Sequence, residues 1–344
     1  MRMKSLHLLA LIALAAATLN GQPVNGPVYW STVAPDCSSL AGESPVAIAN
    51  SSGKTVGYSC YVSGTFVWLA AGGGWSSAIR VAAPASAAIG VDYTFYDASG
   101  HDLKLDTTMG SGSTTSGNDV NFALFPNQPA EIGLLGATSD APKYASTATG
   151  SVYAVFYCPD ATTCGNVVPQ LLYSALPTTP WSLSAPISWD TELWTQWAAE
   201  GIDDGGTHRV SLVIYNEDTT ATSYTVRVYD STGSLAGTGT TPSIPPLQPL
   251  STGSYGEGGT YGALLSDVIA TRLPPGVFKI LVDGGPKYSA VEVLQFNGQS
   301  ATALQVAYDS APGSSSSAAS AERMNIRSAR AASTLKQVFS AMEK

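Results

Sequence analysis

Side chains that could carry out catalysis are few in this sequence and poorly spaced for it. The serine-hydrolase elbow G-x-S-x-G does not occur. Beyond the first 21 residues there are only two histidines, His101 and His208, and each lies in a predicted turn or strand start. Two separate histidines cannot form a histidine-rich metal centre, and in turns such residues are more often solvated than catalytic. We therefore expect no catalytic residue, with an extracellular glycan- or peptide-cleaving hydrolase as a distant alternative.

Adjacent carboxylates are the second chemical feature. Asp203 and Asp204 precede two glycines in a predicted turn, where hard oxygen donors suit calcium. The pattern is not a full calcium loop, and neighbouring turn carboxylates usually accept backbone N–H groups instead. We expect no cofactor and no metal, with Asp203 and Asp204 as weak calcium candidates.

Tryptophans are the most distinctive positive feature. Trp189, Trp194 and Trp197 lie close together, and exposed coplanar rings bind sugars by stacking. The alternative is that these rings fill a core or a junction between domains. Trp194 and Trp197 are three positions apart, so on a regular strand they point to opposite faces and at most one is a core residue. These three residues are the candidate ligand site.

The four cysteines indicate two disulfides. An even number of cysteines in an exported chain is typical of paired cysteines, and three pairings are formally possible. We favour the local pairing, Cys37–Cys60 and Cys158–Cys164. A four-cysteine zinc site lacks the paired short C-x-x-C spacings that it normally uses.

Composition and charge limit the kind of partner. Charged residues make up 12% of the chain, about half of the ordinary ~25%, while the hydrophobic share is 44%. The formal net charge of −9 would repel phosphate backbones, which argues against nucleic-acid binding. We expect an extracellular protein or polysaccharide as partner.

The N-terminus predicts export. Arg2 and Lys4 precede an apolar run over residues 6–19, and the small residues around Ala17 suit a signal peptidase. The run is shorter than the roughly 20 residues that span a bilayer, so a cleaved signal peptide over residues 1–21 is favoured over a membrane anchor. No later segment is apolar enough to be transmembrane. We expect a secreted protein that is periplasmic, at the cell surface or extracellular.

Short alternating strands separated by turn residues predict an all-β protein. Strands recur every 8–12 residues with Gly, Pro, Asn and Ser between them, which is typical of antiparallel β-sandwiches. We expect two tandem immunoglobulin-like sandwich domains, over residues 22–178 and 179–312, with a linker at 177–180. The first domain carries an N-terminal extension and both disulfides.

Internal similarity suggests that the two domains are copies. Four blocks match in the same order. Residues 79–81 match 209–212, residues 91–100 (VDYTFYDASG) match 224–233 (YTVRVYDSTG), and residues 132–144 match 278–288. Last, the strand pair 152–157 and 169–173 matches 291–296 and 304–308. In the second copy that pair is joined through Asn297-Gly298, a strong hairpin signal, and in the first through the Cys158–Cys164 loop.

The last segment, residues 313–344, differs from the rest. A serine-rich spacer is followed by apolar residues at helical spacing and several basic residues. We expect a short basic amphipathic helix. It could dock on its own acidic body, bind a partner or membrane surface, or be a frayed end.

The stretch 66–100 resembles a widespread class of uncharacterised secreted bacterial modules. The resemblance rests on a Gly-rich turn with Trp (Gly72-Gly73-Gly74-Trp75) and a strand that closes on F-Y-D-x-x-G. It implies an immunoglobulin-like sandwich used as a repeated exported module, and it provides no active-site residues. Together, these features predict a non-enzymatic structural or adhesive protein that acts by surface recognition, with a carbohydrate-binding module as the alternative.

Overall fold

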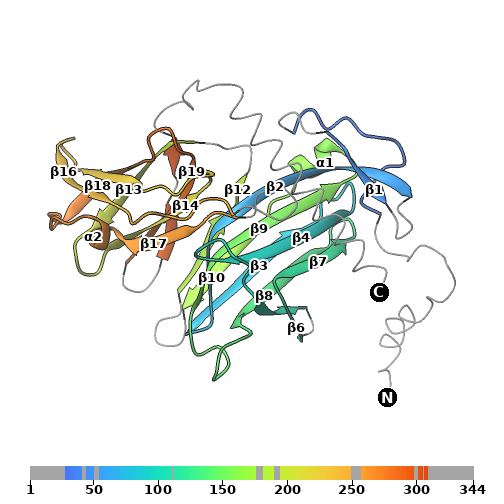
Figure 1. The fold of residues 1–344 in the computed structure, drawn as a ribbon, viewed down its shortest axis with the longest axis horizontal. Helices are drawn as coiled ribbons and strands as arrows, with labels where there is room; N and C mark the ends of the chain where they lie inside the picture. The colour runs from blue at the N-terminus through green and yellow to red at the C-terminus, as the bar shows by residue number, and fades with distance from the viewer. Residues whose placement is uncertain are drawn as a thin grey trace, which may run out of the picture.

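The protein is an all-β protein made of two antiparallel β-sandwiches that lie end to end (Figure 1). The computed structural model describes residues 28–40, 44–49, 54–110, 112–175, 181–189, 194–248, 257–297, 301–304 and 306–308. The predicted signal peptide and C-terminal helix lie outside these residues. Neither of the two short helices in the described part has the length and apolar character needed to cross a bilayer.

Module one contains two sheets. The first is ordered β1-β2-β9-β4-β7, with β12 paired to β2, and the second is ordered β11-β10-β3-β8-β5-β6. The strands of the first sheet are β1 (Val46–Ala49), β2 (Thr55–Ala71), β4 (Ile89–Asp97), β7 (Asp119–Leu124), β9 (Ala148–Cys158) and β12 (Ser188–Trp189). Those of the second are β3 (Trp75–Ala82), β5 (Leu105–Met109), β6 (Ser113–Gly117), β8 (Pro129–Ala137), β10 (Gln170–Ala175) and β11 (Trp181–Pro186). The short helix α1 (Ala161–Gly165) follows β9.

Module two also has two sheets, ordered β16-β15-β18-β13-β21 and β17-β14-β19-β20. The strands of the first sheet are β13 (Gln196–Asp203), β15 (Thr225–Tyr229), β16 (Leu235–Thr240), β18 (Gly276–Asp283) and β21 (Ala307–Tyr308). Those of the second are β14 (Arg209–Asn216), β17 (Thr260–Leu264), β19 (Ser289–Phe296) and β20 (Ala301–Leu304), and helix α2 (Leu265–Val268) follows β17.

Alternation along each strand sorts its residues between core and surface. On β13, Trp197 and Ala199 are buried while Glu200 and Ile202 are exposed, as expected for a half-buried strand. One apolar cluster fills each sandwich, and the cluster of module one also includes Leu294 from module two. The core of module one therefore extends across the junction to the outer face of β19.

The two modules pair their strands in the same order. The sequence β10-β3-β8-β5-β6 in module one corresponds to β21-β13-β18-β15-β16 in module two, and β9-β4-β7 corresponds to β19-β14-β17. The equivalent strands also follow one another in the same order along the chain in both modules, which supports a duplication. One position differs. The strand beside β9 is β2, which comes before β3 in the chain, whereas the strand beside β19 is β20, which comes after β19.

This correspondence corrects two of the matched sequence blocks. Strand β4 is equivalent to β14, so residues 91–100 do not correspond to 224–233, and β3 is equivalent to β13 rather than to 209–212. The false match has a physical cause, because the same turn follows β4 and β15. Asp97 accepts the N–H of Ser99 (2.8 Å), and Asp230 accepts the N–H of Thr232 (2.9 Å). The matches of β8 with β18 and of β9 with β19 agree with the pairing order.

Both predicted disulfides are present, Cys37–Cys60 and Cys158–Cys164. The second disulfide does not close a hairpin, contrary to expectation. Strands β9 and β10 belong to different sheets and do not form a hairpin, and Cys164 lies in α1 between them. The bridge therefore fixes α1 to the end of β9. In module two, β19 and β20 do pair directly.

The domain boundary lies later than predicted. Strand β11 pairs with β10 along its whole length, and β12 pairs with β2. Both strands follow the predicted linker at 177–180, which lies outside the described residues. Module one therefore continues to Trp189, and module two begins near Trp194.

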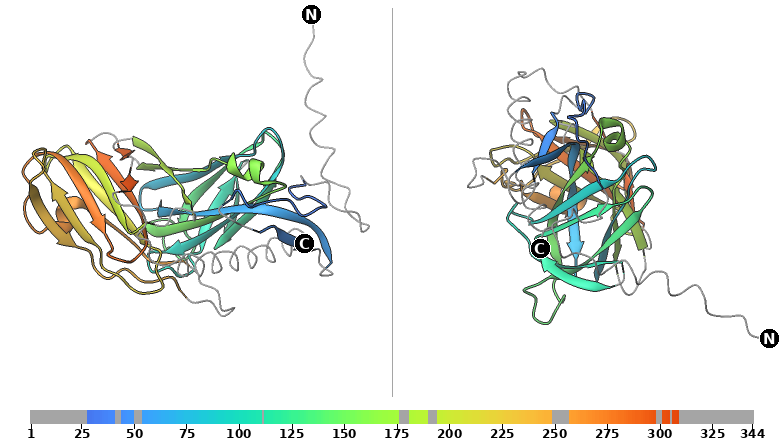
Figure 2. Two further views of the ribbon diagram at one scale, coloured as in Figure 1. Left: turned by 90° about the horizontal axis from the view of Figure 1, so that it is seen from above. Right: turned by 90° about the vertical axis from the view of Figure 1, so that its right-hand side faces the viewer.

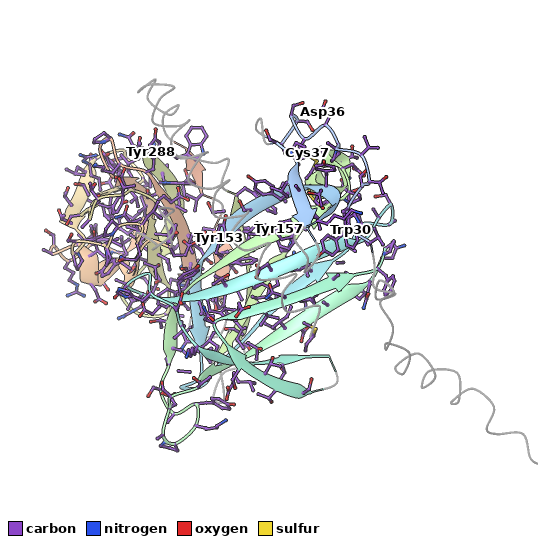
Figure 3. All side chains as sticks on the ribbon, turned by 45° about the vertical axis from the view of Figure 1, so that its right-hand side comes forward. Trp30, Asp36, Cys37, Tyr153, Tyr157 and Tyr288 are labelled. Carbon is purple, nitrogen blue, oxygen red and sulfur yellow. A yellow bond between two sulfur atoms is a disulfide. The ribbon has the colours of Figure 1, made fainter. Side chains whose placement is uncertain are left out.

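The N-terminal extension covers the outer face of the first sheet of module one. Five buried tyrosines pack together at this face, and two of the five, Tyr153 and Tyr157, lie along β9 (Figure 3). Trp30 packs against the edge of this cluster. Tyr29 lies directly over Gly90, where a Cβ atom would be only 2.8 Å from the ring. The remaining tyrosines are Tyr61 and Tyr96. The extension thus closes a face that would otherwise expose aromatic surface.

The modules meet through the outer face of the sheet β17-β14-β19-β20 (Figure 2). A bulge in β2 between Phe66 and Leu69 presents Val67 and Trp68 to this face. Thr260 donates its hydroxyl to the Val67 carbonyl oxygen (2.8 Å). Its backbone N–H donates to the Ala98 carbonyl oxygen (3.0 Å). The junction therefore combines apolar packing with hydrogen bonds.

Candidate functional site

The predicted tryptophan site is divided between two cores. Trp197 is a core residue of module two, 5% exposed, and its indole N–H donates to the carbonyl oxygen (3.0 Å) and hydroxyl (3.1 Å) of Ser289. Trp194 packs against the same core and is half-buried. Trp197 therefore does not have the exposed position expected of a stacking platform, because β13 directs it inward.

Trp189 belongs to the other module. It is half-buried against the core of module one, and its ring meets Phe156 edge-on with centroids 6.1 Å apart. Because β12 pairs with β2, Trp189 packs in module one, whereas Trp194 and Trp197 pack in module two. The three rings do not form one surface.

The Asp203-Asp204 turn uses its carboxylates internally. Asp203 accepts the N–H groups of Gly205 (2.9 Å) and Val210 (3.3 Å). Asp204 accepts from the Gly206 N–H and from the ring and backbone of His208, and these hydrogen bonds, led by that of the His208 ring, lower the pKa of Asp204 to about 2. Within the described residues no group of three or more His, Cys, Asp or Glu side chains could hold a metal.

The two histidines are both placed by an aspartate four residues earlier. The backbone N–H of His101 donates to Asp97 (3.0 Å), and that of His208 donates to Asp204 (2.9 Å). Both side chains are substantially exposed at turns. Among the hydrogen bonds of the described residues, neither ring contacts a serine or threonine hydroxyl, so the arrangement offers no activated nucleophile.

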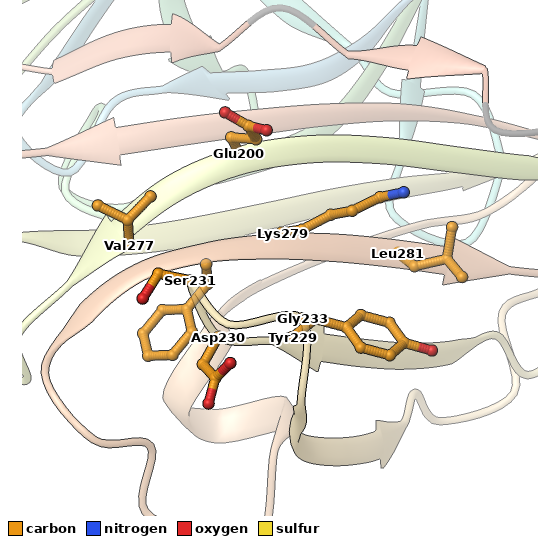
Figure 4. A pocket seen from close by; sticks show the side chains of 9 residues that line it. Glu200, Tyr229, Asp230, Ser231, Gly233, Val277, Lys279 and Leu281 are labelled. Carbon is orange, nitrogen blue, oxygen red and sulfur yellow. The ribbon is translucent and has the colours of Figure 1, made fainter.

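A shallow groove lies on the outer face of the sheet β16-β15-β18-β13-β21, with a volume of about 500 Å³ (Figure 4). Three adjacent strands build it, since Glu200 on β13 lies opposite Lys279 on β18, which lies opposite Tyr229 on β15. The turn after β15 adds Asp230 and Ser231. We call this site the outer groove.

An exposed apolar strip adjoins the outer groove. Ile202 and Val277 are cross-strand partners and are 42% and 50% exposed. Leu235 on the edge strand β16 is 56% exposed and lies opposite Tyr229. Large aliphatic side chains at outward positions of one sheet form a surface that water solvates poorly, and such patches often mark interaction sites.

The chemistry of the outer groove suits binding. Its lining combines an aromatic ring, two carboxylates, an ammonium group and a hydroxyl with aliphatic walls at Val277 and Leu281. No histidine or cysteine lines it. Such a lining offers hydrogen bonds and stacking to a ligand.

The other sheet faces are less available. The outer face of the first sheet of module one is covered by Tyr29 and its neighbours, and that of β17-β14-β19-β20 packs on module one. The remaining face, on the second sheet of module one, is polar and carries the exposed ion pair Arg80–Glu131 (2.6 Å). The apolar strip and the outer groove therefore lie on the most suitable open face.

The sequence contained only a weak signal for this face. Glu200, Ile202, Val277 and Lys279 occupy the outward positions of ordinary alternating strands. The detectable signal is that two aliphatic residues, Ile202 and Val277, stand where polar residues are expected. The two residues form a patch only because β13 and β18 are neighbours.

No protein-family model matches the chain, and no curated protein matches it.

Proposed function

We propose that this is an exported, non-enzymatic β-sandwich protein that acts by surface recognition through the outer groove and its apolar strip. The observation that carries the proposal is the coincidence of the groove with Ile202, Val277 and Leu235 on one open sheet face. Export is supported by the N-terminal sequence and by two disulfides, which persist in oxidising compartments.

Carbohydrate is the second candidate ligand. We propose that it would stack on Tyr229 in the outer groove and not on the tryptophans. An aromatic ring surrounded by carboxylates and a hydroxyl is the combination that stacks on a sugar and bonds its hydroxyl groups. A protein partner would instead use the aliphatic strip more than the ring. The two ligands therefore predict different sensitivities to substitution.

Binding should be measured to immobilised extracellular polysaccharides and matrix proteins. We expect Tyr229→Ala and the pair Ile202→Ser with Val277→Ser each to weaken binding about tenfold or more, the effect of removing one central contact. A larger effect of Tyr229→Ala, with competition by free oligosaccharide, would assign the ligand to carbohydrate. A larger effect of the aliphatic pair would assign it to protein.

Phe125→Ser provides the matched control. Phe125 is 52% exposed at a turn of module one, so its loss removes comparable apolar surface elsewhere. It should bind like the wild type. Equal binding by the outer-groove variants and the wild type to every probe would refute the proposal, as would hydrolysis of a glycoside or peptide panel that depends on Glu200 or Asp230.

A further inference from the structure

A single acidic side chain is buried in the junction between the modules. Glu292 on β19 lies between Ala290 and Leu294, which share its face of the strand and pack against residues of module one. Val291 and Val293 point the other way, into the core of module two. Glu292 therefore faces module one and is only 6% exposed.

The surroundings of Glu292 do not stabilise a negative charge. Its Oε1 atom is buried without a hydrogen-bond partner. Within the described residues no cation offsets the cost of burial, and burial alone raises the pKa of Glu292 to about 8. The carboxyl group is thus mostly protonated at neutral pH in the docked state.

Each neighbouring element contributes an uncharged group. Strand β10 contributes Tyr173, whose hydroxyl donates to the Trp68 carbonyl oxygen. Burial is the main cause that raises the pKa of Tyr173, and the nearby Glu292 raises it further. Strand β14 contributes Val213, the cross-strand partner of Glu292, and Tyr215, whose hydroxyl accepts the Gly258 N–H (3.2 Å). Strand β2 contributes Val67.

Trp68 completes the contact from the side of module one. In module two, Gly262 lies opposite Val213, in the same row as Glu292. A Cβ atom at Gly262 would be 2.8 Å from the Trp68 ring, so this row of the sheet touches module one closely. A charge that appears at Glu292 could be hydrated only if the two surfaces separated.

We propose that the junction is a proton-controlled latch: the modules stay docked while Glu292 carries a proton and separate when it loses it. A group whose pKa is higher in the docked state favours docking most at low pH. The docking constant should fall about tenfold per pH unit as pH rises from the ordinary glutamate value of 4.5 to about 8. Over that interval the fall is about three-thousandfold, and it levels off above pH 8.

The test is small-angle X-ray scattering of the full chain at pH 5, 7 and 9. We expect the radius of gyration of the wild type to increase with pH, while Glu292→Gln stays compact because its side chain is neutral and of the same shape. Far-UV circular dichroism at each pH should show unchanged strand content, which separates undocking from unfolding. If Glu292→Gln fails to fold, Glu292→Leu serves the same purpose.

Two controls define the limits of the measurement. Glu131→Gln removes an exposed carboxylate of module one and should retain the wild-type pH dependence. Gly262→Val should separate the modules at all pH values by displacing Trp68. A wild type that stays compact at pH 9, or the same pH profile for the wild type and Glu292→Gln, would overturn the latch.

Discussion

Replacing Asn216 by alanine should destabilise module two by about 5 kcal/mol, because its buried carboxamide joins four segments. Its Nδ2 atom donates to the carbonyl oxygens of Thr220 (3.0 Å), Ile244 (3.0 Å) and Pro245 (3.1 Å). Its Oδ1 atom accepts from the Asp218 N–H and the Tyr224 hydroxyl (both 2.9 Å). Asn216 is fully buried, so water cannot replace these partners without the site opening.

The size of the effect follows from the groups left behind. Each buried donor or acceptor that loses its partner costs about 1–3 kcal/mol, and alanine leaves several at once. Urea unfolding followed by circular dichroism and tryptophan fluorescence should show module two unfolding before module one. Tyr224→Phe is the graded comparison: it removes one hydroxyl from Asn216 and should cost about 1–2 kcal/mol. A loss below about 1 kcal/mol for Asn216→Ala would contradict the role assigned to this side chain.

Removal of the Cys37–Cys60 disulfide should cost about 3 kcal/mol and release the N-terminal segment from module one. The bridge closes a separation of 23 residues, whereas Cys158–Cys164 closes one of 6. In the loop-entropy account the longer loop gives the larger effect, and the shorter bridge should contribute about 2 kcal/mol. The longer bridge ties the segment that carries Tyr29 to β2, where the Ser59 hydroxyl, next to Cys60, donates to the Tyr29 carbonyl oxygen (2.8 Å).

Thermal unfolding of the two double Cys→Ser variants measures this difference. Loss of Cys37–Cys60 should also increase binding of a hydrophobic dye before the main transition, because the tyrosines of β9 become accessible when Tyr29 leaves Gly90. Loss of Cys158–Cys164 should not increase early dye binding, since α1 does not cover that face. Equal destabilisation with no early dye signal in either variant would show that the segment is held mainly by packing.

Much of the fold could be predicted from the sequence because strand alternation and turn residues are local signals. They predict the all-β class and the two sandwich modules, and the even number of cysteines with their local spacing predicts both disulfides. Strand equivalence was harder, since Asp97 and Asp230 make the same turn after non-equivalent strands. The strand pairing itself depends on contacts between residues far apart in sequence, which a local pattern does not contain.

The site was predicted less well for a related reason. Trp189 and Trp197 are close in sequence, but they enter different cores because β12 pairs with module one and β13 with module two. A single isolated glutamate such as Glu292 has no pattern in the sequence at all. Its importance depends on the packing of the outer face of β19 against module one, which a local pattern does not contain.

The strand order of the first sheet of module one sets the order in which the two modules can fold. All strands of this sheet, from β1 to β12, precede β13, so during synthesis, which begins at the N-terminus, module one can fold before module two is complete. Module two, in contrast, needs β20 and β21 at the end of the described chain. A late error in module two then need not trap the part that is already folded.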